Sequence, residues 1–131
     1  MKKFFSKYKI IFYFLNFFLI FLYLFPGSLL GVIIYDNINK QPQITADFIV
    51  SSNHFYVFFI ISFLGLLSFE KERQIKALLI YLISLSVIIE FFHLFIPERS
   101  FQWSDLFGNL SGVIVVIVIN NLINKYGLFK K

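Results

Sequence analysis

The chain has 131 residues, of which 59% are hydrophobic and only 15% are charged, with a formal net charge of +5. Ordinary globular chains carry about 25% charged residues, and one small core cannot bury this much apolar surface. We therefore expect an all-α integral membrane protein that forms a single domain over residues 1–131. The chain has no cysteine, which excludes disulfides, thiol catalysis and cysteine-bound metals.

Four apolar segments approach the roughly 20 residues with which a helix spans a bilayer. They cover residues 10–25, 49–69, 77–96 and 106–123. No segment shows the strict alternation of a membrane β-barrel strand. The first is longer than the apolar region of a signal peptide and lacks a small-residue cleavage site, so it is predicted to be a retained helix. The pattern predicts a bundle of four transmembrane helices.

Basic residues are distributed unevenly around these segments. All of the 12 lysines and arginines except Lys40 and Arg99 precede the first segment, separate the second from the third or follow the fourth. Because positive residues favour the cytoplasmic side, both termini are predicted to be cytoplasmic and the loops at 36–47 and 97–105 to face outward. The basic clusters are read as topology signals and anionic-lipid contacts, so we expect no nucleic-acid partner.

Polar residues interrupt the apolar pattern between residues 90 and 112. Ionisable residues within membrane segments are costly and often functional. At helical spacing, Glu90, His93 and Pro97 share one face of the third segment. If that helix continues to Pro97, Glu90 lies about 10 Å inside its outer end.

The fourth segment carries a second polar face, formed by Asp105 and Asn109. Asp105 is predicted to cap the helix N-terminus, and the spacing of Gly108 and Gly112 allows another backbone to pack closely. Antiparallel packing of neighbouring helices would bring a histidine of the second segment into the same layer. The predicted binding layer contains His54, Glu90, His93, Arg99, Asp105 and Asn109.

This pattern resembles the VanZ-like family of small bacterial membrane proteins, whose motifs run approximately E-x-x-Q, P-x-R and D-x-x-x-N-x-x-G, with a histidine early in the second helix. The matching residues here are Glu90-x-x-His93, Pro97-x-Arg99, Asp105-x-x-x-Asn109-x-x-Gly112 and His54. The chain departs from the family pattern at His93, where Gln is usual, at Val50-Ser51, where Asp-Lys commonly precedes the histidine, and at Val116, where a second glycine is frequent.

The resemblance implies a multi-pass protein of the bacterial plasma membrane whose polar site faces outward. It also implies a role in resistance to teicoplanin-type glycopeptide antibiotics or in handling cell-envelope glycolipids. Our leading hypothesis is a pocket that binds membrane lipids or a lipid-linked envelope molecule. Arg99 would hold a phosphate or carboxylate through its bidentate fork, while Glu90, His93 and Asn109 would contact the head group. The aromatic contacts to an acyl chain would come from Phe91, Phe92, Phe95 and Trp103.

Two alternatives stay open at the sequence level, so the chain leaves undecided whether the protein is an enzyme. The first is a membrane-embedded hydrolase or transferase acting on a lipid or glycan, with Glu90, His93 or Asp105 as acid–base groups. The second is a structural membrane subunit whose polar layer only fixes helix packing, with Arg99 paired to Glu90 or Asp105. The sequence also leaves homo-oligomerisation open.

Some of the polar residues could also bind a metal ion. His54, Glu90, His93 and Asp105 offer nitrogen and oxygen ligands. However, only one Glu-x-x-His occurs, whereas the di-iron helical bundle requires two, together with two further Glu residues. We therefore expect no metal and no cofactor.

Overall fold

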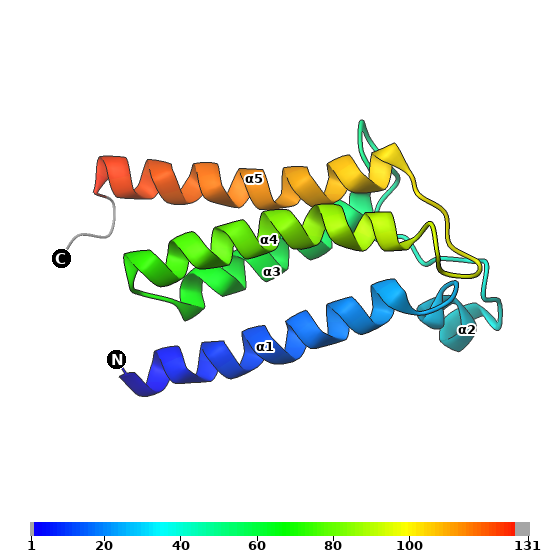
Figure 1. Ribbon diagram of the computed structural model, residues 1–131, viewed down its shortest axis with the longest axis horizontal. Helices are drawn as coiled ribbons and strands as arrows, with labels where there is room; N and C mark the ends of the chain where they lie inside the picture. The colour runs from blue at the N-terminus through cyan, green and yellow to red at the C-terminus, as the bar shows by residue number, and fades with distance from the viewer. Residues whose placement is uncertain (1, 128–131) are drawn as a thin grey trace.

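The computed structural model describes residues 2–127, and all regular structure within this range is α-helical. The helices are α1 (Lys2–Leu24), α2 (Leu29–Tyr35), α3 (Ser52–Ser68), α4 (Glu72–Phe92) and α5 (Trp103–Tyr126). The four long helices run side by side and alternate in direction along the chain (Figure 1). Lys130 and Lys131, which belong to the predicted C-terminal basic cluster, lie outside the described residues.

The two ends of the bundle differ in character. The start of α1, the short α3–α4 connection and the end of α5 lie at one end, where the described basic residues Lys9, Lys71 and Lys125 fall within or beside these elements (Figure 1). The short helix α2 and the two longer connections lie at the opposite end (Figure 1). The loops predicted to share one side of a membrane therefore do share one end of the bundle.

The helices are compatible with a membrane, although they are not clearly four spans. By length and composition, α4 and α5 can each cross a bilayer. Helices α1 and α2 are bent by 83° relative to each other and add a third span only if the two together count as one. Helix α3 is also apolar, but with 17 residues it is shorter than α4 and α5. Large apolar side chains such as Phe17 and Ile80, 69% and 67% exposed, cover the outer surface. Lipid would cover apolar surface of this extent more favourably than water.

The first helix ends where its sequence forces a break. α1 stops at Leu24, and the following Pro26-Gly27 pair cannot continue it because Gly27 has a left-handed φ of 71°. Ser28 then starts α2 by accepting the Gly31 N–H at 2.9 Å on its side-chain oxygen. Residues Leu29–Tyr35 thus form a separate short helix at a steep angle to α1.

The third predicted segment ends earlier than expected. α4 covers Glu72–Phe92 instead of residues 77–96, because the chain passes into tight turns at His93. The N–H groups of His93 and Leu94 bond to carbonyls only three residues back, and the chain before Pro97 leaves the helical path. Pro97 therefore does not share a helical face with Glu90, and Glu90 lies in the last turn of α4 instead of about 10 Å inside the helix end.

Close packing of α5 on α3 sets the centre of the bundle. A Cβ added to Gly112 would lie 2.6 Å from the Phe55 carbonyl oxygen and 2.8 Å from the Phe59 nitrogen. A Cβ on Gly108 would lie 2.8 Å from the Ser51 carbonyl oxygen. The two glycines of the G-x-x-x-G spacing thus face the α3 backbone and allow the helices to touch. The surrounding core contains Phe58, Leu82, Ile89 and Val113.

Candidate functional site

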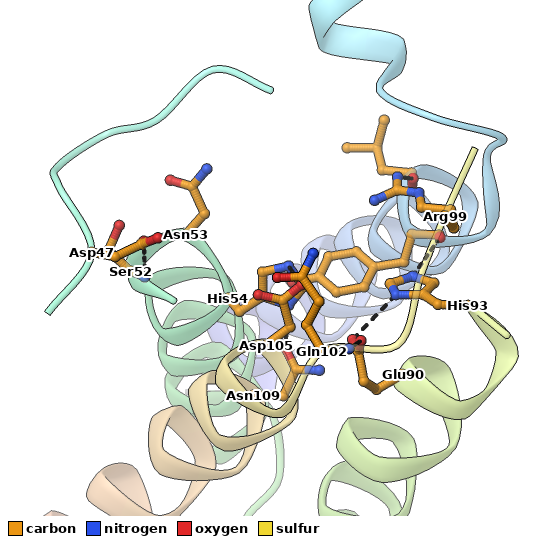
Figure 2. A network of polar contacts seen from close by, with 12 residues as sticks. Asp47, Ser52, Asn53, His54, Glu90, His93, Arg99, Gln102, Asp105 and Asn109 are labelled. Carbon is orange, nitrogen blue, oxygen red and sulfur yellow. Dashed lines mark hydrogen bonds and ion pairs between the residues drawn. The ribbon is translucent and has the colours of Figure 1, made fainter. Parts of the chain in front are cut away.

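The polar side chains meet at the end of the bundle that carries α2 (Figure 2). His54 lies in the first turn of α3, Glu90 in the last turn of α4, and Asp105 and Asn109 in the first turns of α5. Because these three helices alternate in direction, two helix starts and one helix end converge at the same level. Ser51, directly before α3, donates its backbone N–H to the Ser104 carbonyl at 3.1 Å and ties two of these helix ends together.

A chain of hydrogen bonds fixes the orientation of the His54 imidazole. Asn109 donates its Nδ2–H to the Ser86 carbonyl at 3.1 Å, which directs its Oδ1 toward His54 Nδ1 at 2.9 Å. An amide oxygen can only accept, so His54 Nδ1 carries the hydrogen. In neutral His54 the lone pair is therefore on Nε2.

Asp105 faces that second nitrogen of His54. The distance from Asp105 Oδ2 to His54 Nε2 is 3.5 Å, and both side chains are largely shielded from solvent. The predicted role of Asp105 as N-cap is wrong, because α5 starts at Trp103 with Gln102 as its cap residue. Asp105 lies inside the first helical turn, and this position turns its carboxylate toward α3.

Glu90 and His93 form a second buried pair. Glu90 Oε2 lies 3.2 Å from His93 Nδ1, and Glu90 Oε1 accepts the Gln102 N–H at 2.9 Å. His93 Nε2 lies 3.0 Å from the Tyr23 carbonyl oxygen and must donate to it. In neutral His93 the Nδ1 lone pair would then face a carboxylate oxygen, which is repulsive. The contact is attractive only when a proton resides on the pair.

Arg99 is directed away from this cluster. Its Nε–H and Nη2–H donate to the carbonyls of Phe25 and Leu22 at 3.1 and 2.9 Å, so it covers free carbonyls at the end of α1. The predicted Arg99 ion pairs with Glu90 or Asp105 do not form among the described residues. Partial burial lowers the pKa of Arg99 from its ordinary value, yet the guanidinium stays charged at neutral pH.

Two cavities adjoin the cluster, and His54 lines both of them. The larger has a volume of about 320 Å³, lies between the end of α1, α2 and α3, and has largely apolar walls that include Leu22, Leu29 and Val57. The smaller has a volume of about 180 Å³. Its walls are polar and comprise Gln41, Gln43, Asp47, Ser51, Asn53, His54, Gln102 and Asp105.

Sequence reasoning missed two contributors to the site. The ring of Tyr23 lies edge-on to His54 with centroids 5.0 Å apart and stacks on His93 at 6.1 Å. Nothing distinguishes Tyr23 from the other aromatic residues of the first segment before the fold is known. Asn53 holds the 36–51 connection against α3, because it donates to the Pro42 carbonyl at 2.7 Å and accepts the Ile44 N–H at 3.1 Å.

The expectation of no metal rested on counting Glu-x-x-His motifs, and the geometry offers a different ligand set. His54, Glu90 and Asp105 each present one ligand atom, and these three atoms lie within 4.8 Å of one another. They come from three different helices (Figure 2). His93 contacts Glu90 but does not belong to this group.

Comparisons with known proteins find no matching family model, no matching curated protein and no matching solved structure.

Proposed function

We propose that the protein is a VanZ-like, multi-pass protein of the bacterial plasma membrane that binds a lipid-linked envelope molecule in the two cavities beside His54. The observation that carries this proposal is that one buried histidine lines both an apolar and a polar cavity. An amphiphile needs this combination, because its chain gains from apolar walls and its head group requires hydrogen-bond partners.

The chain and the head group of such a ligand would occupy different cavities. The apolar cavity is at the small end of the range for ligand sites and suits the first part of an acyl or prenyl chain. The head group would enter the polar cavity, where Gln41, Gln43 and Asp105 line the wall. Arg99 lines the apolar cavity and bonds through Nε and Nη2 to α1, so its two-point fork is not assigned to the head group in the polar cavity.

The proposed topology is four spans with both termini in the cytoplasm and the site facing outward. The even alternation of α1, α3, α4 and α5 supports it (Figure 1). α3, with 17 residues, is about 26 Å long and is the shortest of the proposed spans. The basic residues at the end opposite the site support the orientation.

Replacing Ser104 with cysteine tests this orientation. Ser104 is exposed at the start of α5, so Ser104→Cys in intact cells is expected to react with a membrane-impermeant maleimide. A cysteine in place of Gln74, near the start of α4, serves as the control and should react only after the membrane is opened. The reverse pattern would place the site on the cytoplasmic side.

The VanZ-like assignment is supported by the position of its motif residues. His54, Glu90, Asp105 and Asn109 come from three separate segments of the chain and form one cluster. Through that cluster we propose a role in teicoplanin-type resistance or in glycolipid handling. The drug effect would follow from binding a surface lipid target and altering its availability.

Blocking the apolar cavity tests the binding proposal. Val57 lines the cavity, so Val57→Trp should fill it, whereas Val118→Trp adds the same bulk on the exposed face of α5. With a polyprenyl phosphate as probe and the protein in nanodiscs, we expect Val57→Trp to weaken binding about tenfold or more, since several buried methylenes lose their contacts. Val118→Trp should bind like the wild type. Equal binding by both variants would show that the ligand does not occupy the apolar cavity.

A further inference from the structure

We propose that His54, Glu90 and Asp105 form a binding site for a divalent transition-metal ion of the Zn²⁺ type. The three ligand atoms lie within 4.8 Å of one another, and each comes from a different helix (Figure 2). This site does not depend on the proposed amphiphile, because it rests only on the side chains of the cluster.

The hydrogen bonding of His54 prepares it to bind a metal ion. Its Nδ1–H is committed to the Asn109 carbonyl oxygen at 2.9 Å, so the lone pair of Nε2 points toward Asp105. A histidine that ligates a metal almost always donates its other N–H in this way, which fixes the ring and raises its basicity. The distance from His54 Nε2 to Asp105 Oδ2 is 3.5 Å. Two ligands of a tetrahedral ion with bonds of about 2.0–2.1 Å lie about 3.3 Å apart, so this pair needs little movement, whereas the three-atom group must contract from separations of up to 4.8 Å.

Glu90 offers a buried carboxylate oxygen to an ion. The Glu90 side chain is completely buried, and the 3.2 Å contact of Oε2 with His93 Nδ1 is attractive only while a proton resides on that pair. Without this proton, the buried oxygen would be costly to leave without a partner. Each carboxylate oxygen has two lone pairs, so Glu90 can ligate an ion while Oε1 keeps the Gln102 N–H.

The balance of charge also favours a cation. Two carboxylates converge here, while the nearby guanidinium of Arg99 is held on the α1 carbonyls and no lysine or arginine among the described residues lines the polar cavity. A divalent cation would neutralise Glu90 and Asp105 together. One imidazole with two carboxylates is a donor set for Zn²⁺, Mn²⁺ or Fe²⁺ more than for Mg²⁺ or Ca²⁺, which favour oxygen ligands alone.

The polar cavity completes the arrangement. It reaches His54 and Asp105 and has a volume of about 180 Å³, which is enough for several water molecules. Three protein ligands with an accessible fourth position are typical of zinc sites that bind or activate a further molecule. The ion would therefore bind where the polar cavity ends.

Metal analysis of the full chain tests the site. The protein is purified in detergent with a tag that contains no histidine, dialysed against Zn²⁺, washed with a weak chelator and measured by mass spectrometry of the elements. The wild type is expected to retain about one Zn²⁺ per chain. Asp105→Asn should bind at least about 10–100-fold more weakly, because substitutions of mere outer-shell partners already cost that much and Asp105 is a direct ligand. Glu98→Gln removes an exposed carboxylate at the same end of the bundle and should bind like the wild type.

Cobalt substitution separates a lost ligand from a lost fold. Co²⁺ in the wild type should give the strong visible bands of a four-coordinate site, and Asp105→His should keep Zn²⁺ because it replaces one ligand with another. The proposal is overturned if the wild type retains no Zn²⁺, if Asp105→Asn binds as tightly as Glu98→Gln, or if wild-type Co²⁺ lacks these bands. The Co²⁺ spectrum of the wild type tests the proposal even if the variants do not fold.

Discussion

Replacing Arg99 with alanine is expected to detach the outer end of α1 from the bundle and to lower stability by about 3 kcal/mol. Arg99 makes two charge-assisted hydrogen bonds, to the carbonyls of Leu22 and Phe25, and each bond to a charged group contributes about 1.5–3 kcal/mol. Without the guanidinium, these carbonyls at the end of a helix keep no side-chain partner from the 93–102 connection. The measurement is thermal unfolding in detergent, followed by intrinsic fluorescence.

Two matched variants show whether the effect belongs to this contact. Arg99→Lys keeps the charge but loses the planar two-point geometry, so it should fall between the wild type and Arg99→Ala. Arg73→Ala removes an exposed arginine from the first turn of α4 and should change stability by less than about 0.5 kcal/mol. If Arg99→Ala were no more harmful than Arg73→Ala, Arg99 would not hold α1 in place.

Gly112→Ala is expected to have the second large effect, through the contact between α3 and α5. The new methyl group would lie 2.6 Å from the Phe55 carbonyl oxygen and 2.8 Å from the Phe59 nitrogen, and these backbone atoms cannot turn aside as a side chain can. The helices must separate, and overpacking of this kind costs about 1–3 kcal/mol and sometimes more. Because Gly108 and Asn109 lie on the same helix, ligand binding should weaken together with stability.

Val118→Leu is the control for added volume on α5. It also adds one carbon, but Val118 is 49% exposed on the outer surface, where lipid or detergent can adjust. We expect its unfolding temperature to match that of the wild type. A similar loss in both variants would show that α5 tolerates no added volume anywhere, and the close approach at Gly112 would lose its special role.

Most helices were predictable from the sequence because each depends on a local apolar run. The segments at 49–69 and 106–123 correspond to α3 and α5 within a few residues. The end of α4 was not predictable in the same way, because Leu94, Phe95 and Ile96 are apolar and continue the pattern. Helix α4 ends at Phe92 because His93 bonds to α1 and the chain turns before Pro97. The distribution of apolar residues indicates neither of these causes.

Part of the polar cluster was predictable from the sequence, but its pairing was not. Helical spacing and antiparallel packing placed His54, Asp105 and Asn109 in one layer, where the structure also has them. The contacts of Arg99 with α1 were not foreseen, and the ion pair with Glu90 or Asp105 that was left open as an alternative does not form among the described residues. Charge favours a carboxylate partner, whereas the free carbonyls at the end of α1 give no signal in the sequence. Backbone groups at helix ends are strong acceptors, and only the fold shows where they lie.

The bonding of Arg99 to α1 changes the charge balance of the polar cluster. Because Arg99 is held on α1, the carboxylates of Glu90 and Asp105 are compensated by His93, by His54 or by a bound cation. An anionic head group entering the polar cavity would meet negative charge unless one of these is present. Binding of a phosphate-bearing lipid should therefore strengthen when a divalent metal ion is present.

Binding of an amphiphile beside His54 is the central claim, and titration of the wild type in nanodiscs with three probes tests it most directly. The probes are a polyprenyl phosphate, the matching polyprenol and a soluble short-chain phosphate. Use of both cavities predicts that the polyprenyl phosphate binds at least about tenfold more tightly than either part alone, since each cavity adds its own contacts. Equal affinity for the polyprenol and the polyprenyl phosphate, or no binding of either, would contradict the claim.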